Sequence, residues 1–115
     1  MSLLTESIPI ETASDGTDLS TFRAGGILLH AIRLELGTLS TPDFTITEQP
    51  NGDSILAVAA VAADKTWYPS VLDDDAAGAD VAGSARPYPV YDRIQIATAG
   101  GGANKTGRLI LLYER

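Results

Sequence analysis

The chain has 115 residues, no cysteine and a formal net charge of −7 at neutral pH, so we expect one acidic domain around a single hydrophobic core. The lack of cysteine excludes disulfides, thiolate nucleophiles and cysteine-ligated metal centres. Basic residues are scattered singly along the sequence, whereas binding to a phosphate backbone needs clustered lysine and arginine. No apolar run approaches the roughly 18 residues of a membrane-spanning helix. We therefore expect no nucleic acid and no membrane as partners.

Residues 1–19 are polar and show no helical periodicity. We expect them to form an extended N-terminal arm that lies over the domain or reaches a neighbouring molecule, with a frayed terminus as the alternative. Ile8 and Ile10 lie in the short apolar piece of this arm and are its expected interface residues. Residues 20–115 are expected to form the folded β-sandwich domain.

The first strand region is predicted from about Thr21 to Leu36, with a turn or bulge at Gly25-Gly26. After these glycines the residues are assigned to two faces by a period of two. One face of this predicted strand holds Leu28, His30, Ile32, Leu34 and Leu36. The other face holds Ile27, Leu29, Ala31, Arg33 and Glu35. Because the second face begins with apolar residues, Ile27 and Leu29 need cover from a second layer, the N-terminal arm or another subunit. We favour the last two, which makes both residues expected interface residues.

The remaining sequence predicts short strands separated by turns. Phe44 and Ile46 point inward from a strand over residues 43–48, and Asn51-Gly52 predicts a hairpin turn after it. The alanine-rich run 54–63 suits helix or strand, and its β-branched residues favour strand. The later elements are a short strand at 67–69, a loop at 72–89, a strand at 91–99 with Ile94 and Ile96 inward, a glycine-rich loop at 100–107 and a strand at 108–114. This order predicts an all-β fold, a single-domain antiparallel β-sandwich or flattened barrel.

Three patterns look like chemical sites. The loop at 100–106 is similar to a phosphate-binding loop, but it lacks the glycine before Lys105 and a helix after it. The segment Asp73–Asp80 begins like a calcium loop without the ligands of its later positions, and a looser calcium site stays open. His30, the single histidine, has no serine on an elbow motif to serve. We therefore predict no enzyme, no catalytic residue, no cofactor and no metal, and we expect His30 to be packed or to lie at an interface.

Aromatic residues gather in the sequence around the long loop. Trp67 is expected in the core as the largest apolar side chain. Tyr68 and Tyr88 are expected at an interface, because tyrosine is enriched among the residues that dominate binding between proteins.

The order of several segments resembles small virion proteins of tailed bacteriophages, namely decoration or auxiliary proteins of the head and related minor structural proteins. The similar segments are Gly26 to Leu36, Trp67-Tyr68-Pro69, Pro89 to Ile94, the glycine-rich loop through Gly107, and Leu109 to Tyr113. The chain departs from that group at Ser70, where a basic residue is expected.

The resemblance implies a β-sandwich that forms a homo-oligomer, with a trimer favoured, and binds the major capsid protein or another virion protein. It also implies a location on the capsid surface after synthesis in the bacterial cytoplasm. A carbohydrate- or ligand-binding β-sandwich module is the alternative, motivated by the aromatic residues near the long loop.

Overall fold

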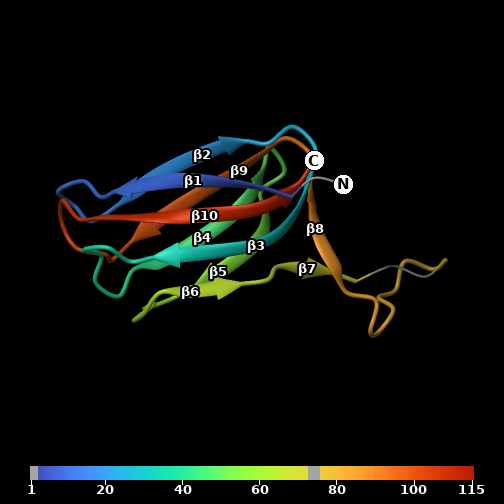
Figure 1. Cartoon of the computed structure of the whole chain (residues 1–115). Coiled ribbons are helices and arrows are strands. Elements are labelled where there is room, and N and C mark those ends of the chain that lie inside the picture. Colours follow the sequence, from blue (N-terminus) through green and yellow to red (C-terminus); the bar gives the residue numbers. More distant parts are fainter. Residues whose placement is uncertain (1–2, 73–75) are drawn as a thin grey trace.

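A computed structural model describes residues 3–72 and 76–115, and these residues form an antiparallel β-sandwich (Figure 1). The predicted all-β fold is confirmed. Two sheets lie face to face, and the apolar side chains between them make the core.

The larger sheet has six strands in the described part of the chain, in the order β1-β10-β3-β8-β7, and β6 also pairs with β3. Every pairing in it is antiparallel. Its strands are β1 (Leu3–Glu11), β3 (Ile27–Glu35), β6 (Lys65–Trp67), β7 (Ser70–Val71), β8 (Arg86–Val90) and β10 (Thr106–Glu114).

The smaller sheet has four strands, in the order β2-β9-β4-β5. They are β2 (Asp18–Arg23), β4 (Asp43–Gln49), β5 (Asp53–Val58) and β9 (Arg93–Ala99). The turn predicted at Asn51-Gly52 joins β4 to β5 as an antiparallel hairpin. Phe44, Ile46 and Ile94 point inward and are buried, as predicted.

The N-terminal segment is extended, but it differs from the expected arm because it is part of the sandwich. Residues 3–11 pair with β10 along their whole length, and β2 begins at Asp18, before the expected domain boundary. The reason is the alternation in β1, which turns Ile8 and Ile10 into the core opposite Leu109 and Gly107.

The alanine-rich run 54–63 is a strand only as far as Val58. Beyond it the backbone turns away from the sheet, because Ala60 has a positive φ of 50°. The carboxylate of Asp43 accepts a hydrogen bond from the Ala60 N–H at 2.7 Å, and the Pro42 carbonyl accepts one from the Val61 N–H at 3.0 Å. These two bonds fix the segment outside the sheet, where β4 already has β5 as its neighbour.

The end of the sandwich that holds the glycine-rich loop is closed by hydrogen bonds between loops. The Thr12 hydroxyl donates to the Gly102 carbonyl at 2.7 Å and accepts from the Lys105 N–H at 2.8 Å. The Ser40 N–H donates to the Gly101 carbonyl. The predicted glycine-rich loop therefore connects β9 to β10 and also ties this end together.

The long loop is shorter than the predicted range 72–89, because β8 begins at Arg86. β7 and β8 run out from the body of the sandwich, and the described part of the segment between them extends beyond it (Figure 1). β8 carries Pro87 and Pro89 and pairs with β3 over only three residues. Proline has no N–H to donate to a strand ladder, which fits the short pairings that β8 makes with β3 and β7.

Gly107 offers a test of the packing beneath the closed end. A Cβ atom at Gly107 would lie 2.6 Å from Leu39 Cδ1 and 2.7 Å from the Leu36 carbonyl oxygen. We expect Gly107→Ala to lower the free energy of unfolding by about 3 kcal/mol, because backbone atoms must move. Urea denaturation measures the change.

The matched control is Gly25→Ala. Gly25 has a positive φ of 66°, but a Cβ atom there would have no other atom within 4 Å, so this change adds only backbone strain of about 1 kcal/mol. Equal losses in the two variants would contradict the packing described for Gly107.

Candidate interaction surface

A β-bulge in β3 determines which side chains face outward at the end of the sandwich opposite the glycine-rich loop. Ala31 pairs with Leu112 and Leu29 pairs with Tyr113, so the register with β10 skips His30. One extra residue in a strand reverses the alternation beyond it. Leu29 on one side of the bulge and Ile32 on the other are therefore both fully buried.

This bulge corrects the two predicted faces of the strand. Ile27 and Leu29 lie in the core between the two sheets, so the second layer of their own chain covers them. Leu28 and His30 were expected to share a face with Ile32, and instead they point away from the core, with Leu28 37% exposed. The prediction of an unbroken period of two was wrong, because His30 has no partner in β10 and the alternation of side chains reverses there.

Leu28 lies at the centre of an exposed apolar surface. It shares one hollow of about 230 Å³ with Pro87, Pro89 and Tyr91. A second hollow, of about 280 Å³, shares Leu28, Pro89 and Tyr91 with the first and continues to the C-terminal residues. We call Leu28, Pro87, Pro89 and Tyr91 the outer patch; Tyr91 is 74% exposed.

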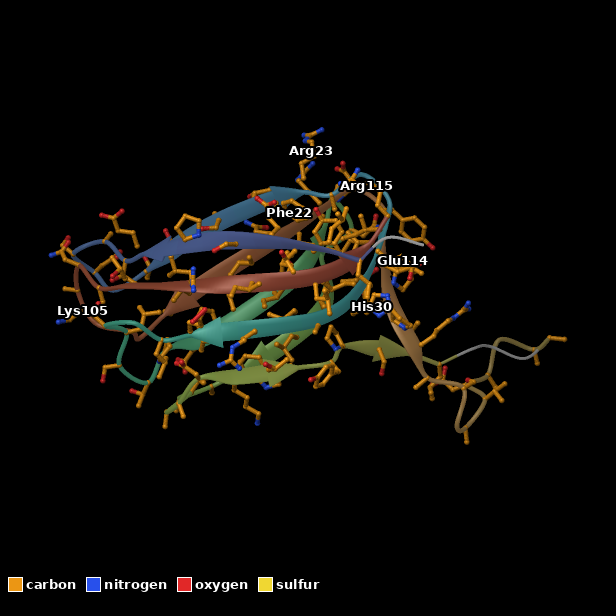
Figure 2. All side chains as sticks on the ribbon, viewed as in Figure 1. Phe22, Arg23, His30, Lys105, Glu114 and Arg115 are labelled. Carbon is orange, nitrogen blue, oxygen red and sulfur yellow. The ribbon has the colours of Figure 1, made fainter. Side chains whose placement is uncertain are left out.

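Charged side chains border the outer patch. His30 Nε2 lies 3.1 Å from Glu114 Oε1, and both side chains are partly buried. Glu114 and Arg115 line the second hollow, and Arg86 lines the first. Figure 2 shows His30, Glu114 and Arg115 at one end of the sandwich and Lys105 at the other. The patch is thus apolar at its centre and charged at its edge.

A buried carboxylate supports the backbone beneath Tyr91. Glu48 points inward from β4 and is only 3% exposed, and its Oε2 accepts a hydrogen bond from the Tyr91 N–H at 3.3 Å. The neighbouring connection from β2 to β3 is held by two N–H groups, of Ala24 and Gly25, which donate to the Asp92 carbonyl. Hydrogen bonds therefore hold both connections between the two sheets at this end, the one from β2 to β3 and the one from β8 to β9.

Tyr88 lies on the inner side of β8, close to this carboxylate. Partial burial raises the pKa of its phenol, and the negative charges of Glu48 and Asp53 raise it further. Tyr88 packs against the core with part of its side chain exposed.

The other predicted interface residues divide into two groups. Ile8, Ile10, Ile27 and Leu29 are buried in the core, and Ile27 also lines the second hollow. Tyr68 is 75% exposed, and it follows Trp67, which pairs with Ile32 of β3. Trp67 itself is only partly buried and packs against the edge of the core.

Sequence reasoning did not select Leu28, Pro87, Pro89 or Tyr91 as interface residues. Leu28 could be found only by knowing that the bulge lies at His30. A local signal existed for the prolines, because Pro87 and Pro89 alternate around Tyr88. Residues two apart on a strand share a face, so the two rings had to lie on the same side.

Within residues 3–72 and 76–115, no three acidic or histidine side chains gather closely enough to hold a metal ion. Part of the calcium site left open at Asp73–Asp80 lies outside the described residues, since residues 73–75 are not among them. No helix that could cross a membrane occurs in the described part of the chain.

The chain was compared with known protein families and with curated proteins, and neither comparison found a match.

The raised pKa of Tyr88 predicts a loss of stability in alkali. The unfolded chain releases the phenolic proton near pH 10, whereas the folded protein still holds it, so stability falls as pH rises above about 10. We expect Tyr88→Phe to reduce this fall. Urea denaturation between pH 9 and 11 measures the free energy of unfolding of each variant. Tyr68→Phe is the control, because it also removes one phenol. The same pH dependence in Tyr88→Phe and wild type would contradict the assignment.

Proposed function

We propose that the chain is a non-enzymatic structural protein of a bacteriophage virion that binds the assembled head and stabilises it. The outer patch is the single observation that carries this proposal. It supports binding to another protein because a large exposed tyrosine, a leucine and two prolines lie together around two hollows. The resemblance to phage virion proteins supplies the identity of the partner, the major capsid protein or another virion protein.

The composition of the outer patch supports a protein partner in three ways. Proline rings and the tyrosine ring lose little conformational freedom when a partner covers them. Tyrosine and arginine are enriched among the residues that dominate protein interfaces. An apolar centre with a charged edge also matches the usual anatomy of such interfaces.

The proposed mechanism is linkage between binding and assembly. A protein that binds the assembled shell, and not its separated subunits, stabilises the shell by mass action. At a free concentration one hundred times its Kd, one bound copy contributes about 2.7 kcal/mol to the site that it occupies. The protein would then be located on the capsid surface, after synthesis in the bacterial cytoplasm.

The net charge of −7 suits a basic contact surface on the partner. Attraction between the two would speed association and would weaken as salt screens it. Homo-oligomerisation is part of the proposal, and the resemblance implies a trimer. A closed trimer needs two different surfaces on each copy.

A carbohydrate-binding module is the second candidate. Trp67 lines a crevice together with Asp64 and Lys65, an aromatic ring beside two hydrogen-bonding side chains. Two features argue against this candidate. Lys65 Nζ lies over the ring of Trp67, 5.8 Å from its centroid, and Asp64 already accepts a hydrogen bond from the Leu36 N–H. A glycan array with wild type and Trp67→Ala tests it; binding lost in the variant would favour this candidate over the virion protein.

The virion proposal predicts that the protein is found in purified particles by mass spectrometry and binds expanded heads that lack it. We expect Leu28→Ala and Tyr91→Ala each to weaken binding at least about tenfold, the effect of removing an interface hot spot. Co-sedimentation with the heads over a range of protein concentrations gives the Kd.

Leu19→Ala is the control, because Leu19 is an exposed leucine, even more exposed than Leu28, on β2 of the other sheet. It should bind as wild type does. Absence of the protein from particles, or no binding of wild type to expanded heads, would refute the virion function. Equal Kd values for all three variants and wild type would refute the role of the outer patch.

A further inference from the structure

The free edge of β5 lacks lysine and proline, although a β-bulge at Ile55 interrupts it. β5 is the last strand of the smaller sheet and pairs only with β4. Its sequence, Asp-Ser-Ile-Leu-Ala-Val, contains no lysine and no proline, the residues that most often block an open edge. Ile55, Leu56 and Val58 are partly exposed there.

The edges on the opposite side of the sandwich differ. β1 carries Pro9 and the exposed Glu6 and Glu11 along its length, which makes it a poor template for another strand. β2, the edge of the smaller sheet on that side, lies against β1 (Figure 1). Of the long edge strands, β5 is therefore the one best suited to accept a partner.

The directions of the β5 side chains select one way to pair two copies. β5 has a β-bulge at Ile55, which has no partner in β4, so the alternation of its side chains is interrupted there. Val58 and Leu56 share the inner face with Phe44 and Ile46, and Asp53 pairs with the buried Glu48, while Ala57 and Ser54 are on the outer face. Antiparallel pairs must place both residues on the same face. Pairing Asp53 with Val58 and Ser54 with Ala57 of a second copy satisfies this condition, and it places the bulged Ile55 opposite Leu56 at the centre of the contact.

Shifting this register by one residue puts inner side chains opposite outer ones. Shifting it by two leaves residues of the six-residue strand without partners. The selected register also keeps the two Asp53 carboxylates at opposite ends of the pair, each beside an apolar residue, so no like charges face each other.

Charge complementarity at the neighbouring crevice supports the same register. Val58 lines a crevice of about 450 Å³ together with Lys65, Trp67 and the small side chains of residues 59–63. In the selected register the second copy's Asp53 lies opposite Val58, at the crevice that contains Lys65. The two-fold axis repeats this approach of a carboxylate to an ammonium group at both ends.

We infer that two copies of this chain associate through β5 in the antiparallel register centred between Ile55 and Leu56. The smaller sheets of the two copies then form one continuous sheet, and each copy covers part of the other's crevice. This contact is isologous, so it joins chains in pairs. It pairs two single chains or two trimers equally well, and it does not depend on the proposed virion function.

The double variant Ser54→Lys with Ala57→Lys tests this contact. Both side chains are exposed on the outer face of β5, so the fold is expected to remain, which circular dichroism checks. Lysine on an edge strand opposes the approach of another strand. Size-exclusion chromatography with light scattering should give an even number of chains for wild type and half that mass for the variant.

The charge-matched control is Thr5→Lys with Ser7→Lys on β1, whose side chains are also exposed. It changes the net charge by the same amount and should keep the wild-type mass. A wild-type mass of one or three chains, or an unchanged mass in the β5 variant, would overturn the inference.

A charge exchange tests the register itself. Lys65→Glu should raise the dissociation constant of the pair at least tenfold, and adding Asp53→Lys should restore most of the loss. If the second change does not restore association, the selected register is overturned. Binding to phage heads does not enter any of these measurements, so their outcome is separate from that of the proposed function.

Discussion

The extra residue at His30 determines which side chains of β3 reach the core. β3 lies between β10 and β8 in the larger sheet, so its inner face must be apolar along the whole strand. Burial of a large aliphatic side chain contributes roughly 1.5–3 kcal/mol. Without the bulge, either Ile27 and Leu29 or Ile32 and Leu34 would face outward, and two such contributions would be lost. The bulge buries all four and turns Leu28 outward.

The two ends of the sandwich differ in structure. Hydrogen bonds between Thr12, Gly102 and Lys105 close one end. At the other end, Leu28 lies beside Pro89 of β8, and His30 beside Glu114 of β10. Hydrogen bonds hold the β2–β3 and β8–β9 connections there, so Leu28 and Tyr91 of the outer patch lie next to hydrogen-bonded backbone. A preformed surface loses less conformational entropy on binding, which is the physical reason why we propose the contact with a partner at this end.

Much of the fold follows from sequence patterns, because alternation and turn residues act locally. Phe44, Ile46 and Ile94 were correctly placed inward, and Asn51-Gly52 correctly marked a hairpin. The errors came from long-range pairing. Nothing in residues 26–36 shows that β10 skips His30, and nothing in residues 1–19 shows that Ile8 has a place opposite Leu109. Most of the outer patch was missed for the same reason, since Leu28 and Tyr91 are neighbours only after β3 and β8 pair.

Thiol labelling of single-cysteine variants tests the role of the bulge most directly, because the chain contains no cysteine of its own. Leu28→Cys, Leu29→Cys and Ile32→Cys are compared in the folded protein and again in denaturant. We expect fast labelling of Leu28→Cys and protection of the other two variants until the protein unfolds. Fast labelling of Leu29→Cys, with Leu28→Cys and Ile32→Cys both protected, would mean that β3 alternates without a bulge and would contradict the account.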